Sequence, residues 1–155
     1  MQKLKTMKKY STNIIRKIIL IIFALLALIC IRIFQAELFY DPFISFFKVN
    51  FHNQVLPDFD TLKLIVNLFF RYALNSLCTI WILYLLFNSN SVIKLATLLL
   101  AVFFILLLIL FLVLIHAEIE LNYMLLFYVR RFLIQPIFLL LFIPAFYYQT
   151  LRKKN

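Results

Sequence analysis

Apolar residues form four long runs along the chain, separated by short polar segments. The runs cover about residues 14–36, 62–87, 95–115 and 123–148. A bilayer's hydrocarbon core is about 30 Å thick and needs roughly 20 apolar residues per helix, so each run is long enough to cross it. The sequence therefore predicts an all-α fold: an integral membrane bundle of four transmembrane helices, with residues 1–155 forming a single transmembrane domain.

Composition strengthens this prediction and removes several function classes. The chain is 66% hydrophobic, whereas soluble domains are near half apolar. It has no glycine, which excludes Gly-rich phosphate loops and dinucleotide fingerprints. Its two cysteines and two histidines have no metal-ligand spacing, so we expect no metal, no cofactor and no catalytic residue. The one catalytic alternative is a Cys30–His116 pair, because both residues fall near the same predicted membrane surface.

The distribution of charge predicts the topology. The net charge is +10, and the basic residues gather at the N-terminus, at Lys94 in the second loop and at the C-terminus. Positive residues flank the cytoplasmic ends of membrane spans, so both termini and the second loop are predicted to be cytoplasmic. All acidic residues then fall outside: Glu37, Asp41, Asp58, Asp60, Glu118 and Glu120. The basic excess is explained by topology, so we expect membrane lipid and no nucleic acid as a partner.

Four arginines lie inside the predicted spans. At a rise of 1.5 Å per residue, Arg130 and Arg131 lie about 10–12 Å below the outer end of their span, Arg71 about 14 Å and Arg32 about 6 Å. An arginine near the centre of a span costs about 2.5–3.5 kcal/mol on insertion scales, which favours packing these side chains inward. Arg130 and Arg131 point about 100° apart, so we expect only one of them to face the bundle interior.

Other polar residues share helix faces with these arginines. Asn67, Arg71 and Asn75 are four apart in the second span, and Arg131 and Gln135 are four apart in the fourth. The candidate intramembrane polar or anion-binding cluster is Arg32, Asn67, Arg71, Asn75, Arg130, Arg131 and Gln135, with Glu37 and Asp41 as candidate counter-charges at the outer rim.

Three roles stay open for this cluster. In the first, the arginines stabilise the bundle by pairing with acidic residues or by reaching the lipid headgroups. In the second, they form an outward-facing pocket for a carboxylate, a phosphate or a lipid headgroup. In the third, the cluster binds another membrane protein.

The first loop, about residues 37–61, is rich in aromatic residues. We expect it to lie in the membrane interface, with Tyr40 and several phenylalanines at headgroup level. Asp41-Pro42 favours a turn or a helix start. The alternative is that the loop caps the arginines or contacts a partner.

Several segments resemble small membrane proteins of the exosortase F system-associated family. The segments are ELFYDPFISFF (37–47), LPDFD (56–60), NLFFRYALNSL (67–77), LFYVRRFLIQP (126–136) and PAFYYQ (144–149). The resemblance implies a multi-pass protein of the bacterial cytoplasmic (inner) membrane, encoded beside an exosortase that processes sorting signals on exported proteins.

The function that follows is a non-catalytic accessory membrane protein of an exosortase F protein-sorting system, which binds or assists the exosortase or its substrates. The alternatives are an outer-leaflet membrane enzyme and a small transporter with an outward-facing anion pocket. The sequence does not predict the oligomeric state.

The predicted topology can be tested by labelling single cysteines. In a variant without Cys30 and Cys78, we expect Ser45→Cys and Ser89→Cys to react with a membrane-impermeant maleimide from opposite sides. Labelling of both from the same side contradicts the topology.

Overall fold

The structure is a computed structural model that describes residues 2–48, 57–116, 123–135 and 137–152. Every element in these ranges is an α-helix. In chain order the helices are α1 (Gln2–Ile33), α2 (Gln35–Leu38), α3 (Phe43–Phe46), α4 (Thr61–Phe87), α5 (Asn90–His116), α6 (Tyr123–Ile134) and α7 (Ile137–Arg152). The predicted all-helical class holds for this part of the chain.

Three of the helices are long and apolar enough to cross a membrane, which is compatible with a multi-pass membrane protein. They are α1, over Asn13–Ile33, and all of α4 and α5. The predicted fourth span differs from expectation because it is divided into α6 and α7, which are bent by 65° at the break between them. The described residues therefore contain three candidate spans, or four if this bent pair crosses as one unit.

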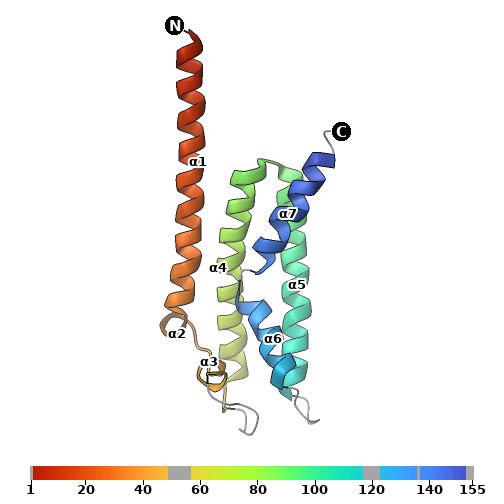
Figure 1. Cartoon of the computed structure of the whole chain (residues 1–155). Coiled ribbons are helices and arrows are strands. Elements are labelled where there is room, and N and C mark those ends of the chain that lie inside the picture. The colour runs from red at the N-terminus through yellow and green to blue at the C-terminus, as the bar shows by residue number, and fades with distance from the viewer. Residues whose placement is uncertain (1, 49–56, 117–122, 136, 153–155) are drawn as a thin grey trace.

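The helices run side by side, and the bundle has two distinct ends (Figure 1). Both termini and the turn between α4 and α5 lie at one end, called here the terminal end. The short helices α2 and α3 and the first turns of α4 and α6 lie at the other, called the loop end. The start of α1 and the end of α7 thus lie at the same end of the bundle, while the cytoplasmic position of both termini stays a prediction.

Polar residues define both ends of α4. The Asp60 side chain accepts hydrogen bonds from the backbone N–H groups of Leu62 and Lys63, at 3.0 and 3.2 Å. These bonds satisfy donors that have no partner within the helix. At the other end Asn88 adopts the left-handed conformation, with φ 46°, and its N–H donates to the Tyr84 carbonyl. In a chain without glycine, asparagine is the residue that tolerates this cap most readily.

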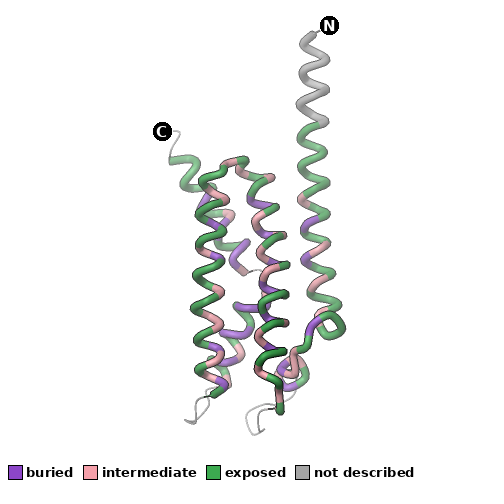
Figure 2. Tube along the Cα trace, turned by 180° about the vertical axis from the view of Figure 1, so that it is seen from behind, coloured by how far each residue is buried: buried purple, intermediate pink, exposed green. Residues whose placement is uncertain are grey.

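The core lies between α4, α5, α6 and α7, and α1 is attached at its edge. Along the described side chains of α1 only Ala24 and Leu28 are buried, where they pack against Ile82 of α4 and Leu139 of α7. Figure 2 shows that most of the described side chains of α1, from Asn13 onward, are exposed. The small Ala24 side chain allows a close approach between helices, which is a common means of helix association in membranes.

The aromatic loop turns back into the bundle at α3. Phe43 is fully buried, and its ring lies 5.4 Å from that of Phe59 and 5.8 Å from that of Phe111 in α5. Phe46 is also buried. The turn thus buries these two phenylalanines in the hydrophobic core, while the position of the loop at headgroup level stays a prediction, and its residues 49–56 lie outside the described residues.

The break between α6 and α7 is bridged by α4. The side-chain amide of Asn75 donates to the Ile134 carbonyl at 3.1 Å, and both residues are buried. Inside a continuous helix this carbonyl would accept from the backbone four residues later. In lipid an unpaired backbone carbonyl costs several kcal/mol. Asn75 thus makes the break tolerable at this depth, a role that the sequence alone did not assign to it.

We expect Asn75→Leu to destabilise the protein by about 1–3 kcal/mol, because it leaves the Ile134 carbonyl buried without its donor. The measurement is the thermal unfolding midpoint in detergent. Gln149→Leu, on the exposed face of α7, is the matched control. Equal midpoints for the two variants would show that the amide does not stabilise the break.

Candidate functional site

The centre of the polar cluster is the carboxylate of Asp41, which lies near the loop end. Its Oδ1 accepts from Arg130 Nε at 3.3 Å and from the Phe43 backbone N–H at 3.2 Å. Its Oδ2 accepts from Arg130 Nη2 at 2.5 Å and from Arg71 Nη1 at 3.5 Å. Four donors fill the roughly four acceptor positions of a carboxylate. Asp41 is therefore bound on every side by its own chain, and its contact with Arg130 is bidentate.

The three charged side chains of this site are buried. The exposed fraction of the side chain is 3% for Asp41, 3% for Arg71 and 7% for Arg130. Each guanidinium also lies over an aromatic ring, Arg71 over Phe39 at 5.8 Å and Arg130 over Phe47 at 5.7 Å. Ring faces attract cations, so these phenylalanines compensate part of the excess positive charge.

The loop is held against α4 by hydrogen bonds on either side of Asp41. The Tyr40 backbone N–H donates to Asn67 Oδ1 at 3.0 Å, and Asn67 Nδ2 donates to the Lys63 carbonyl at 2.8 Å. On the other side of Arg71, Gln35 Oε1 accepts a hydrogen bond from Arg71 Nη2. The predicted polar face of α4 thus positions the loop through Asn67, holds its carboxylate through Arg71 and closes the helix break through Asn75.

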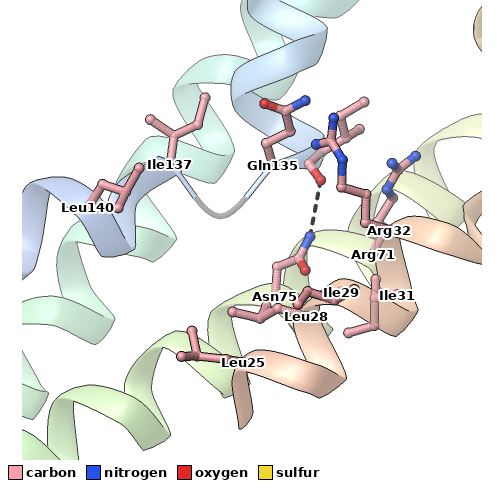
Figure 3. A pocket seen from close by; sticks show the side chains of 11 residues that line it. Leu25, Leu28, Ile29, Ile31, Arg32, Arg71, Asn75, Gln135, Ile137 and Leu140 are labelled. Carbon is pink, nitrogen blue, oxygen red and sulfur yellow. Dashed lines mark hydrogen bonds between the residues drawn. The ribbon is translucent and has the colours of Figure 1, made fainter. Parts of the chain in front are cut away.

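Two cavities adjoin this buried site. The first, about 380 Å³, lies between α1, α4 and the α6–α7 break, and Arg32, Arg71, Asn75 and Gln135 are its polar lining residues. Figure 3 shows the two guanidinium groups and Gln135 toward one side of it, with Leu25 and Leu140 toward the other.

The second cavity, about 300 Å³, lies nearer the loop end. Its polar lining residues are Arg32, Gln35, Lys48, Arg130, Arg131 and Gln135. Arg32, Gln135 and Ile134 line both cavities, so the two spaces adjoin at these residues.

The predicted site residues separate into a buried group and a cavity group. Asn67, Arg71, Asn75 and Arg130 make contacts inside the bundle. Arg32 and Arg131 are exposed beside the cavities, and Arg131 Nε donates to Gln135 Oε1 at 3.1 Å. One of the adjacent arginines thus faces inward and the other does not, as their angular separation requires.

The two candidate counter-charges have different outcomes. Asp41 reaches the arginines, whereas Glu37 is exposed and forms no ion pair among the described residues. The site also contains residues that the sequence did not single out, namely Gln35, Phe39 and Phe47. Gln35 lies between Arg32 and Glu37, three positions after Arg32, and this spacing was the available sign of its role.

The alternative catalytic pair receives no support from the geometry. Cys30 is on α1 and His116 is on α5, and α4 lies between these helices (Figure 1). The His116 Nδ1 lies 3.0 Å from the Leu112 carbonyl of its own helix, and its ring packs edge-on against Phe59. Within the described ranges no group of three or more His, Cys, Asp or Glu residues is placed to hold a metal ion.

The chemistry that this arrangement offers is charge pairing and anion binding. Asp41 has no acceptor position left for a substrate proton, so it is poorly suited to act as a base. The exposed guanidiniums of Arg32 and Arg131, by contrast, are donors suited to phosphate or carboxylate oxygens.

Comparison of the chain with protein-family models, curated proteins and solved structures gave no match.

We expect Asp41→Asn to destabilise the protein by about 3–5 kcal/mol, because removing one partner of a buried ion pair leaves the other charges uncompensated. The unfolding midpoint in detergent measures this loss. Asp58→Asn removes an exposed carboxylate of the same loop and should leave the midpoint unchanged. If both variants unfold at the wild-type temperature, the ion pairs of Asp41 with the arginines do not stabilise the fold.

Proposed function

We propose that this protein is a non-catalytic accessory membrane protein of an exosortase F protein-sorting system, located in the bacterial cytoplasmic membrane. In this role it binds the exosortase laterally and holds it or its substrate in place. The proposal combines the resemblance of the sequence segments with the contacts that those segments make in the fold.

The observation that carries the proposal is that three of the segments that resemble the exosortase F system-associated family each contribute a charged residue to one ion-pair site. Asp41 comes from ELFYDPFISFF, Arg71 from NLFFRYALNSL and Arg130 from LFYVRRFLIQP. These polar residues, the most distinctive ones in the resemblance, contact each other. A set of residues that is used to hold a fold together supports a role for the fold itself, as a binding scaffold, in preference to a reaction.

The exposed side of α1 supports lateral binding of a partner. Phe23 is 71% exposed, and Leu26 and Ile33 are also exposed on a helix that buries only two described side chains in the core. Because α1 is attached at the edge of the bundle, a second membrane protein can pack against it without disturbing the Asp41 site. Helix packing of this kind gains from van der Waals contact and from the release of lipid.

Co-purification with the exosortase in mild detergent tests the proposal. We expect wild-type protein to bring the exosortase with it. The double variant Phe23→Ala/Leu26→Ala should lose most of this yield while keeping its unfolding midpoint, because these side chains support no internal contact of the core.

The matched control is Leu106→Ala/Val113→Ala, which removes equally exposed apolar side chains from α5. It should leave co-purification intact. Absence of the exosortase from the wild-type preparation, or an equal loss in both double variants, would count against binding through α1.

A further inference from the structure

The two adjoining cavities differ in character and together form one amphipathic cleft, defined here by the lining residues of both. The first cavity has seven leucine and isoleucine residues among its eleven lining residues. The second has four cationic residues among ten: Arg32, Lys48, Arg130 and Arg131. The cleft therefore passes from a basic part near the loop end to an apolar part beside the C-terminal turns of α1.

The basic part has more cations than the fold can neutralise. Arg71 and Arg130 share the single carboxylate of Asp41. No Asp or Glu is among the residues that line either cavity, and among the described residues Arg32, Lys48 and Arg131 form no ion pair. Uncompensated cations at membrane depth are costly, so a counter-anion from outside the chain would be bound favourably.

Arg71 provides an independent sign of this shortage of acceptors. It lines the first cavity and is only 2% exposed, yet no described residue accepts a hydrogen bond from its Nε. Buried polar groups of native proteins nearly always have a partner. The deficit at Arg71 thus agrees with the deficit of carboxylates around Arg32 and Arg131.

The apolar part of the cleft opens sideways. Its wall residues Leu25, Ile29 and Leu140 are 42%, 51% and 73% exposed. These residues belong to the predicted membrane spans, so the opening faces acyl chains. An occupant from the bilayer reaches the cleft without crossing any part of the protein.

We propose that the cleft binds one anionic phospholipid. Its phosphate lies between Arg32, Arg131 and Lys48, and one acyl chain lies along Leu25, Ile29 and Leu140. Guanidinium groups suit phosphate oxygens, to which they donate paired hydrogen bonds. A free phosphate would leave the apolar part unused, and a peptide carboxylate would bring polar backbone groups into an apolar wall. The proposal is independent of the exosortase, because the site is complete within this chain.

The test uses native mass spectrometry of the purified full-length protein in mild detergent, with phosphatidylglycerol and phosphatidylcholine of identical acyl chains. We expect one phosphatidylglycerol to bind at least tenfold more tightly than phosphatidylcholine, because the two lipids share the phosphate but the quaternary ammonium of phosphatidylcholine is repelled by the cations of the cleft, and tenfold corresponds to about 1.4 kcal/mol. Arg32→Gln/Arg131→Gln should remove this preference. The control Lys63→Gln/Lys94→Gln removes two exposed cations outside the cleft and should retain it.

A second variant tests the acyl site separately. Ile29→Trp fills the apolar part and should weaken binding of both lipids while leaving the unfolding midpoint of the lipid-free protein unchanged. Glycerol phosphate and an apolar peptide with a free C-terminal carboxylate serve as probes for the other occupants. Tighter binding of either one than of phosphatidylglycerol would overturn the proposal, as would equal affinity for the two lipids or a preference unaffected by Arg32→Gln/Arg131→Gln.

Discussion

The contacts at the loop end of this bundle depend on one buried carboxylate that lies between two guanidinium groups. Asp41 accepts from Arg71 and Arg130 while its own backbone is held beside α4 by the Tyr40–Asn67 hydrogen bond. Charges in such surroundings attract strongly, but each is costly when left alone. The loop, α4 and α6 are therefore held together, because separating any one of them from the others leaves a buried charge without its partner. The aromatic rings of Phe39 and Phe47 cover the same charges and keep them from the surroundings.

The main features of the fold follow from hydrophobic periodicity and charge. The apolar runs predict α4, α5 and the apolar part of α1, Asn13–Ile33, within a few residues, because a helix that spans a membrane must satisfy all of its backbone groups internally. The helical segment that precedes Asn13 in α1 is polar and was not predicted. The same pattern cannot predict the break between α6 and α7. The run contains Pro136 and Pro144 but is apolar throughout, so it is interpreted as one continuous span. At the 65° bend the Ile134 carbonyl accepts a hydrogen bond from the Asn75 amide, which is 59 residues away and could not be identified as its donor from the sequence.

The site was predictable as a set of residues and not as a set of contacts. Spacing of four along α4 placed Asn67, Arg71 and Asn75 on one face, and the angle between neighbouring residues required Arg130 and Arg131 to diverge. Which acid would reach the arginines was beyond the sequence, since Glu37 and Asp41 are both near the same end. Asp41 reaches the arginines because the turn at Pro42 and the burial of Phe43 place it inside the bundle. The burial of Phe43 was likewise beyond the sequence, because it depends on contact with Phe111 in α5.

The separation of the paired residues along the chain has a consequence for biogenesis. Asp41 precedes Arg71 by 30 positions and Arg130 by 89, so the three residues leave the ribosome far apart in time. A chain that has been synthesised only as far as α4 contains Asp41 and Arg71 but lacks Arg130, so only one of the two ion pairs of the site is available to it. Completion of the site is thus tied to the arrival of the C-terminal segment, because α6 supplies both hydrogen bonds of the bidentate contact.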